Sequence, residues 1–234
     1  MLGPNLDVTG PDIEAPGLPV LEMHNVADGD AAARMVDYWA DQGATSFKAY
    51  MMLPRESLRR AIEAAHRRGL KITGHLCAVS YREAADLGID NLGHGFGAMT
   101  DFVPGRRPDT CPLDRLGTLL DTIDPDAPEV SELIAHLVER DVALTSTLVV
   151  FEDMTPGAAR LGEPARALLS PSALATYDAI HQLIDRADAA RGAANMAKVG
   201  RPSSIRTSTG TGPTSSRSTS RARRSLAGTR PSRV

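Results

Sequence analysis

The sequence predicts an α/β fold in which helices cover a parallel sheet. Strand-like and helix-like segments alternate over residues 1 to about 197, and the alternation repeats every 20 to 27 residues or so, which is typical of a βα barrel or a doubly wound sheet. Hydrophobic residues make up 42% of the 234 residues and charged residues 24%, so the chain can bury a substantial core. These proportions exclude a fully disordered or collagen-like chain.

The first half of the chain carries the clearest alternation. Each predicted helix has apolar residues at helical spacing along one face, and each predicted strand is a short, largely apolar run. Gly43 and Gly69 are placed to end two of the helices, and Pro54 is placed to begin one. In chain order, helices are expected at 30–42, from Pro54 to Gly69 and at 81–87, and strands at 44–50, 71–76 and 89–95.

The second half begins with a long segment, about 98–128, that is rich in Pro, Asp and Gly. A connection of this length inside a compact domain is usually functional, so we expect a lid or binding loop. An amphipathic helix over 130–137 then leads into a predicted strand at 143–150. Residues 156–198 are Ala-rich and predict helix, interrupted near Pro171.

The charge is divided unevenly along the chain. The net charge is −3, but the segment from Lys198 onward carries nine of the 26 basic residues and none of the 29 acidic ones. We therefore expect a domain at 1–200 and a basic, low-complexity tail at 201–234 that is disordered, because it has too few apolar residues to offset the cost of ordering its backbone. A frame change near Gly200 would explain this composition. A nucleic-acid-binding arm is the alternative, disfavoured because no aromatic residue is interleaved for base stacking.

The chain shows no targeting or spanning segment. No stretch approaches the roughly 18 consecutive apolar residues of a membrane-spanning helix, and the first residues do not resemble a signal peptide, so we expect a soluble cytoplasmic protein with no membrane partner. Cys77 and Cys111 lie far apart without a CxxC pattern. We expect them to be ordinary thiols, neither disulfide-bonded nor bound to zinc.

Three side chains suited to metal chemistry follow consecutive predicted strands: Lys48 in SFKAY, His75 in ITGHL and His94 in NLGHG. The carboxyl ends of parallel strands share one edge of a sheet, and neighbouring strands are about 4.8 Å apart, so one metal ion could contact all three. Imidazole nitrogens are usual ligands of zinc, and a buried lysine becomes an anionic oxygen ligand if carbon dioxide converts it to a carbamate. A single histidine would more often be a core residue and a single lysine would reach solvent; the triple favours a metal site.

The same motifs resemble a known family. GATSFKAY, GLKITGHL and LGIDNLGHGF are similar to the fourth, fifth and sixth strands of the metal-dependent amidohydrolase superfamily, in its imidazolonepropionase-like and prolidase-like branch, and the resemblance extends over 6–200. It implies a (β/α)8 TIM barrel with one or two divalent metals, expected to be zinc, held by carboxylated Lys48, His75 and His94. It also implies hydrolysis of a carbon–nitrogen bond in a small-molecule amide, peptide-like or cyclic amide substrate.

Two family features are missing from the sequence. The HxH pair of the first strand has no counterpart, because His24 is the only histidine before Lys48, and no acidic residue after Asp188 could be the catalytic Asp of the eighth strand. We therefore expect a partial barrel lacking its first strands and its eighth strand, with no identifiable catalytic residue and with little or no activity. Such a barrel would expose unpaired strand edges.

Alternative functions stay open at this point. Lys48 could form a Schiff base, as in barrel aldolases, which would make the protein a lyase. The protein could also be a non-enzymatic nucleic-acid binder acting through its tail, an alternative disfavoured by the lack of aromatic residues for base stacking. The substrate, the metal number and the oligomeric state are not predicted.

Other polar residues have simpler interpretations. His66 and His136 lie off the apolar faces of their helices and are expected to be solvated, whereas His181 is expected to pack beside Tyr177. The arginines of GRRPD (105–109) could meet an anionic substrate group, but a solvated charge pair is the better interpretation.

Overall fold

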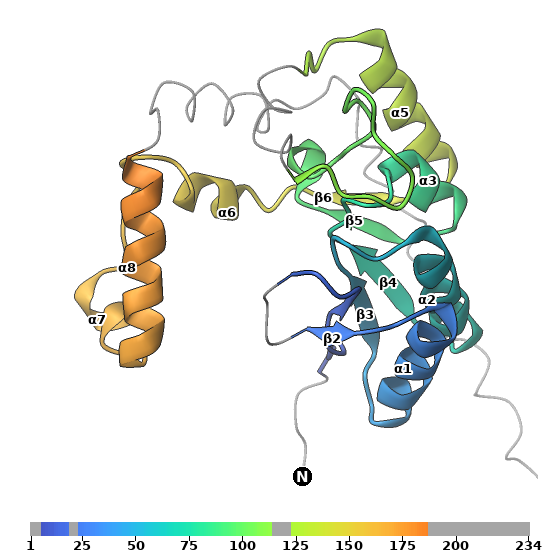
Figure 1. Cartoon of the computed structure of the whole chain (residues 1–234), viewed down its shortest axis with the longest axis horizontal. Helices are drawn as coiled ribbons and strands as arrows, with labels where there is room; N and C mark the ends of the chain where they lie inside the picture. The colour runs from blue at the N-terminus through green and yellow to red at the C-terminus, as the bar shows by residue number, and fades with distance from the viewer. Residues whose placement is uncertain (1–5, 19–22, 114–122, 187–234) are drawn as a thin grey trace, which may run out of the picture. The chain divides into compact units, whose positions relative to one another are not determined.

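The computed structural model describes residues 6–18, 23–113 and 123–186, and these contain one six-stranded sheet (Figure 1). The strand order is β2-β1-β3-β4-β5-β6, and every pairing is parallel. The strands are β1 Ile13–Glu14, β2 His24–Asn25, β3 Ser46–Ala49, β4 Lys71–Gly74, β5 Asn91–Gly93 and β6 Ala143–Thr145. The prediction of an α/β fold with a parallel sheet is confirmed.

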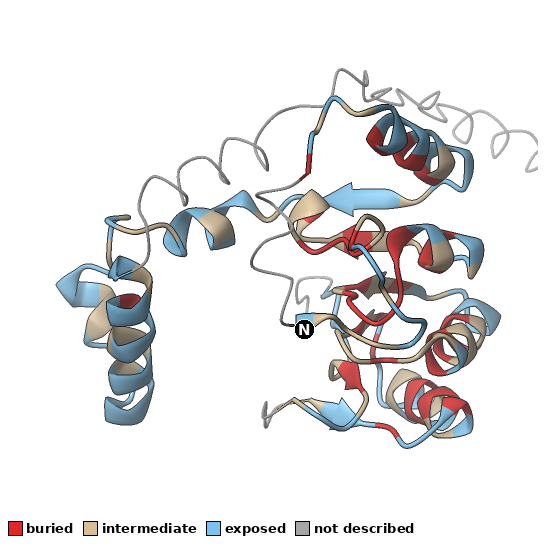
Figure 2. Ribbon diagram, turned by 45° about the horizontal axis from the view of Figure 1, so that its top comes forward, coloured by how far each residue is buried: buried red, intermediate tan, exposed pale blue. Residues whose placement is uncertain are grey.

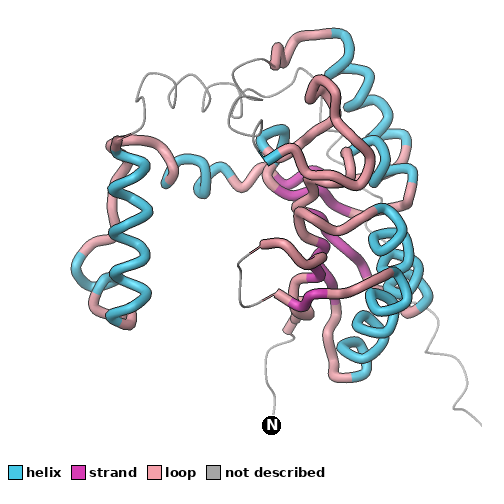
Figure 3. Tube along the Cα trace, in the orientation of Figure 1, coloured by secondary structure: helices cyan, strands magenta, loops and turns pink. Residues whose placement is uncertain are grey.

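Helices follow most of the strands. They are α1 Gly29–Asp41, α2 Arg55–Arg67, α3 Tyr81–Asp86, α5 Pro128–Glu139, α6 Leu148–Asp153, α7 Glu163–Arg166 and α8 Pro171–Asp185, with a 3₁₀ turn, η1, at Gly95–Gly97. Helices α1, α2 and α3 lie along one side of the strands (Figures 1 and 3). This one-sided cover is typical of a βα barrel, whereas a doubly wound sheet carries helices on both faces.

Local sequence explains where the helices begin. Asp28 caps α1 by accepting a hydrogen bond from the backbone N–H of Ala31 at 2.7 Å. Ser80 and Glu83 form a capping box at the start of α3, in which each side chain accepts from the backbone N–H of the other residue. Pro128 occupies the first turn of α5, where its missing N–H costs nothing.

The two faces of the central strands differ in polarity. Phe47, Ile72 and Leu92 are fully buried in the core, where α1 and α2 also place their apolar residues. On the alternate positions Lys48 is in register with Thr73, whose hydroxyl donates to Asn91 Oδ1 at 2.7 Å. Side chains alternate between the two faces of a strand, so this second face carries the polar side chains Lys48, Thr73 and Asn91.

The strand predicted at 143–150 is correct only in its first half. β6 ends at Thr145, and a helix, α6, begins at Leu148. Thr147 adopts a left-handed backbone conformation (φ 48°), which ends the extended run despite its β-branched residues. The Ala-rich segment forms α7 and α8, separated before Pro171; its end beyond residue 186 lies outside the described residues, as does the tail at 201–234.

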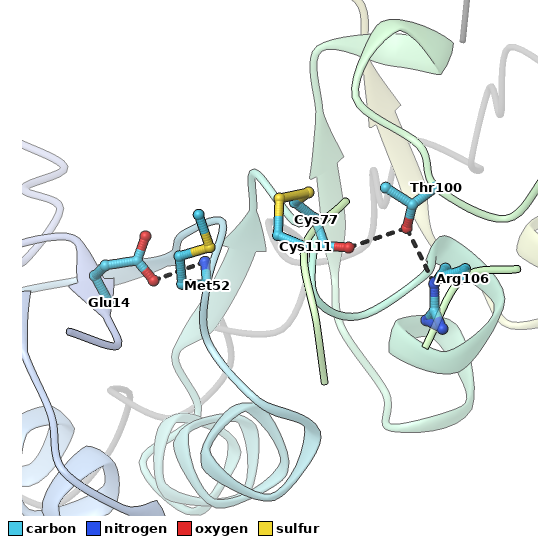
Figure 4. The surroundings of a disulfide bond; sticks show 6 residues. All are labelled: Glu14, Met52, Cys77, Thr100, Arg106 and Cys111. Carbon is cyan, nitrogen blue, oxygen red and sulfur yellow. Dashed lines mark hydrogen bonds between the residues drawn. A yellow bond between two sulfur atoms is a disulfide. The ribbon is translucent and has the colours of Figure 1, made fainter. Parts of the chain in front are cut away.

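The prediction that Cys77 and Cys111 are free thiols is wrong. The two residues form a disulfide, with Cα atoms 4.8 Å apart (Figure 4). The loop after β5 folds back toward the end of β4, a non-local contact that the spacing of two cysteines in the sequence does not reveal. The predicted long loop is confirmed over residues 98–113, and residues 114–122 lie outside the description.

No helix in the described part of the chain is both long enough and apolar enough to cross a lipid bilayer.

Candidate metal centre

The two predicted imidazole ligands lie side by side. His75 follows β4, His94 follows β5, and their ring centroids are 4.0 Å apart with the planes inclined at 58°. The backbone N–H of His75 donates to the carbonyl of Ala49 at 2.9 Å, which fixes the end of β4 against β3. The strand order therefore brings together two residues that are separated by a helix and a strand in the sequence.

The Tyr50 ring lies between Lys48 and this pair, in contact with both Lys48 and His75. Its Nζ lies 5.2 Å from the centroid of the Tyr50 ring, and the Tyr50 and His75 rings are 4.7 Å apart in an edge-to-face arrangement. The ammonium also forms an ion pair with Asp12, at 3.4 Å from Oδ2, and one third of the side chain is exposed. Lys48 is thus not an isolated buried cation, and the pairing with Asp12 and Tyr50 was not predicted from the sequence.

Both imidazoles are held in the uncharged form. Burial, the neighbouring His94 and the charge of Lys48 lower the pKa of His75 to about 3. Burial and, to a smaller extent, the Lys48 charge also lower the pKa of His94. Neutral rings keep a nitrogen lone pair free at neutral pH, which is the state that binds a metal ion.

The backbone at His94 is unusual. His94 and Thr147 both adopt left-handed conformations, with φ angles of 68° and 48°, and His94 Nδ1 lies 2.8 Å from Thr147 Oγ1. A non-glycine residue in this region costs about 1–3 kcal/mol and persists where the surroundings enforce it. The hydrogen bond orients the ring of His94 and involves Nδ1, so Nε2 is the nitrogen left for a ligand.

An apolar cavity of about 180 Å³ adjoins the two imidazoles. Phe151 forms part of its wall, with its ring centroid 6.2 Å from that of His94 and perpendicular to it. The lining residues are Met51, His75, Leu76, Cys77, His94, Gly97, Ala98, Val150, Phe151 and Met154. The cavity can accept a small apolar group next to a pair of nitrogen donors.

The donor set fits a divalent metal in part. His75 Nδ1 is buried without a hydrogen-bond partner, which is costly for a polar atom unless a ligand satisfies it. Among the described residues, however, no three His, Cys, Asp or Glu side chains are grouped closely enough to hold a metal. A catalytic zinc ion usually has three protein ligands, so the third donor would have to be Lys48.

The remaining predicted polar residues have structural partners. His181 packs against Tyr177, with ring centroids 4.1 Å apart, as expected. His66 and His136 are not simply solvated, because their Nε2 atoms lie 3.0 Å and 3.1 Å from Asp90 and Asp86.

Two further charged groups, the Arg106–Glu83 pair and Glu14, differ in how far the sequence predicted them. Arg106 pairs with Glu83, which confirms a charge pair for that arginine, but its side chain is only 12% exposed, so the expectation that the pair is solvated is wrong. Glu14 is buried, its Oε1 accepts from the Met52 N–H at 2.8 Å, and its Oε2 has no partner; sequence reasoning gave it no role.

Comparison with known proteins gives a result at the level of fold. No family model matches the chain, and no curated protein matches it. Among solved structures, it is similar to bottromycin amidohydrolase, with a TM-score of 0.52 and 19% identity, over 81% of this chain and 40% of that one. It also matches a putative prolidase from Bifidobacterium longum (TM-score 0.44, 17% identity, 86% and 44% coverage) and a Xaa-Pro dipeptidase (0.39, 11%, 76% and 44%).

The chain therefore spans less than half the length of each of these three proteins. The similarity to bottromycin amidohydrolase confirms the predicted resemblance for the fold: the parallel sheet and its helices match part of an amidohydrolase structure. The roles of Lys48, His75 and His94 are not tested by these comparisons and stay predictions.

Proposed function

We propose that this chain is a metal-dependent hydrolase of the amidohydrolase kind, acting on a carbon–nitrogen bond of a small-molecule amide, peptide-like or cyclic amide substrate. The observation that carries the proposal is the pair of uncharged imidazoles, 4.0 Å apart, that ends two adjacent parallel strands. The fold similarity to an amidohydrolase and the unsatisfied nitrogen of His75 support it.

His75, His94 and Lys48 would hold the metal, for which zinc is the natural candidate because two of the donors are imidazole nitrogens. Lys48 would contribute as a carbamate: its neutral amine attacks carbon dioxide, a carbon–nitrogen bond forms, and the nitrogen loses a proton. Lys48 would first have to leave its ion pair with Asp12. Bound in this way, a divalent metal would polarise the substrate carbonyl and lower the pKa of a water molecule.

The protein's own residues supply binding and orientation. The apolar cavity would hold the substrate beside the imidazoles, and its wall of Met51, Phe151 and Met154 would limit the access of bulk water. The printed sequence has no HxH pair before Lys48 and no acidic residue after Asp188, and we assign no general base. We therefore propose low or absent turnover for this chain.

Metal titration tests the proposal. Isothermal calorimetry with zinc should show saturable binding to the wild-type chain, and His75→Ala and His94→Ala should each weaken it by about 100-fold or more. His66→Ala is the matched control. His66 lies in α2 and pairs with Asp90, so this variant should leave zinc affinity unchanged. Absence of zinc binding, or an equal loss in His66→Ala, would contradict the proposal.

Lys48 needs a separate experiment, because a Schiff-base lyase would use the same side chain. Lys48→Met should weaken zinc binding, and added bicarbonate should strengthen it in the wild type only. Trapping of a carbonyl compound on Lys48 by borohydride would favour the lyase and count against the hydrolase.

A further inference from the structure

The disulfide between Cys77 and Cys111, called here the disulfide clasp, lies beside the candidate metal centre. Cys77 is two residues after His75 and lines the same cavity as His75 and His94. Cys111 lies near the far end of loop 98–113. This loop follows η1, the 3₁₀ turn that begins directly after His94. The clasp (Figure 4) therefore closes a covalent ring, from Cys77 to Cys111, that contains His94 and begins two residues after His75.

The two sulfur-bearing residues face different environments. Cys77 is 1% exposed, whereas Cys111 is half-buried and lines a second pocket, of about 310 Å³, at the surface of the loop. This pocket contains Arg106 and Arg107 and no acidic residue. Arg106 is paired with Glu83, so the exposed Arg107 is the charge that would attract a small anionic molecule to the Cys111 side of the clasp, whereas burial excludes such a molecule from the Cys77 side.

Polar contacts hold the first part of the loop independently of the clasp. Thr100 Oγ1 donates to the carbonyl of Cys77 at 3.1 Å and accepts from Arg106 Nε at 3.3 Å (Figure 4). Arg106 also pairs with Glu83. Asp109 accepts from the backbone N–H of Arg55 at 2.7 Å. Among the described residues, the hydrogen bonds given for 110–113 are local, such as Leu113 N–H to the Cys111 carbonyl, and the clasp ties Cys111 to Cys77 after β4.

We propose that the disulfide clasp is a thiol-exchange site, attacked at Cys111 Sγ by a small anionic thiol that binds in the arginine-lined pocket. Opening the clasp releases the end of loop 98–113 from the segment that follows His75 at the end of β4. The consequence for metal binding rests on the proposed function, whereas the exchange itself does not.

The exchange is balanced as follows. The incoming thiolate forms a bond to Cys111 Sγ, the Cys77–Cys111 bond breaks, and the Cys77 sulfur leaves with the electron pair and takes a proton from water. A second thiolate then attacks the external sulfur of the mixed disulfide and releases Cys111, which is also protonated. The clasp gains two electrons and two protons, and two external thiols are oxidised to one external disulfide. Attack at Cys111 is favoured because the Cys77 side is buried.

The first test uses glutathione as the anionic thiol and 2-mercaptoethanol, which carries no charge besides that of its reacting thiolate, as the control. The disulfide-bonded chain is mixed with glutathione and the reaction is quenched early. Peptide mass spectrometry should then find the mixed disulfide on Cys111. Arg107→Glu should slow the reaction with glutathione about threefold more than the reaction with 2-mercaptoethanol, because Arg107 is an exposed residue of the pocket and the glutathione thiolate carries the larger negative charge. A mixed disulfide on Cys77, or equal effects on both thiols, would overturn the proposal.

The second test follows the loop itself by hydrogen–deuterium exchange. Reduction of the wild type should accelerate exchange over 107–113 by about tenfold and leave α1 unchanged, and Cys77→Ser/Cys111→Ser should show the fast exchange without reductant. Unchanged exchange on reduction would overturn the proposal. Zinc titration of the same samples separates the two hypotheses. If neither redox form binds zinc, the proposed function is contradicted. The mass-spectrometric and hydrogen-exchange results still show whether the disulfide clasp is a thiol-exchange site.

Discussion

Two regions of this chain are built from similar residue types but bury them very differently. In the first, β3 to β5 with α1 to α3, the apolar residues Phe47, Leu58 and Leu92 are fully buried (Figure 2). In the second, β6 to α8, Val149 is 76% exposed and Leu168 87% exposed. Helices α6 and α7 contain no buried residue, and α8 contains one, His181.

The difference shows that a pattern of apolar residues predicts an element but not its burial. The first region is stabilised by a shared core, whereas the described contacts of the second are largely polar: Arg166 with Asp178, Arg160 with Asp185, and Leu161 N–H with the Tyr177 hydroxyl. Short helices without buried faces are marginal in water, so the second region should contribute little to the free energy of unfolding.

The largest expected effect comes from the same substitution made in both regions. Leu58→Ala, in α2, removes a fully buried side chain and should lower the free energy of unfolding by about 2–5 kcal/mol. Leu183→Ala, in α8, removes a side chain that is 66% exposed and should change it by less than about 0.5 kcal/mol. Urea denaturation followed by circular dichroism measures both, and similar losses would refute the contrast between the regions.

A smaller effect tests the contact between the regions at the candidate cavity. A Cβ added at Gly97 would overlap the ring of Phe151, so Gly97→Ala should destabilise the protein by about 1–3 kcal/mol. Adding Phe151→Ala should relieve the overlap and give a favourable coupling energy in a double-mutant cycle. Simple additivity of the two changes would show that η1 and α6 are not in contact.

Helix caps give a third, weaker comparison. Ser80 is only 7% exposed, and Ser80→Ala breaks the capping box of α3. This change should lower the free energy of unfolding by about 1–2 kcal/mol. Ser170→Ala removes a single cap hydrogen bond at the exposed start of α8 and should cost about 0.5 kcal/mol or less. Thermal denaturation of the two variants measures this difference, and a larger loss for Ser170→Ala would reverse the ranking.

The smallest expected effect is a pH dependence within the first region. Burial raises the pKa of Glu14 above its ordinary value of 4.5, so the folded state keeps a proton that the unfolded state has already lost. The stability from this group is complete below pH 4.5 and is lost as the pH rises through the folded-state pKa.

Glu14→Gln removes this titration while keeping an oxygen that can accept from the Met52 N–H. The stability of the wild type relative to Glu14→Gln should therefore fall as the pH rises above 4.5, which urea denaturation at several pH values would show. A difference that is constant with pH, or that rises, would contradict the raised pKa.

The sequence predicted those features that follow from local pattern. The strand ends that carry Lys48, His75 and His94 could be located from short apolar runs and glycines, and the parallel order then brought His75 and His94 together. The Asp12 and Tyr50 contacts of Lys48 and the disulfide clasp depend on how distant loops fold over the sheet. No spacing rule within one segment encodes such contacts.

The wrong prediction of a strand at residues 146–150 has a different cause. The run after Thr145 has the β-branched composition of a strand, but the left-handed conformation of Thr147, hydrogen-bonded to His94, ends the strand and α6 follows. A side-chain contact with another strand end decided the local structure, which a propensity for extended structure cannot anticipate.

The central claim is that Lys48, His75 and His94 surround one divalent metal. A crystal of the chain grown with zinc and bicarbonate, measured at the zinc absorption edge, tests this most directly. The claim predicts one strong anomalous peak about 2.0–2.1 Å from a nitrogen of each imidazole, with density for a carbamate on Lys48. A fully loaded crystal with no peak between the two rings, or with zinc bound only elsewhere, would contradict it.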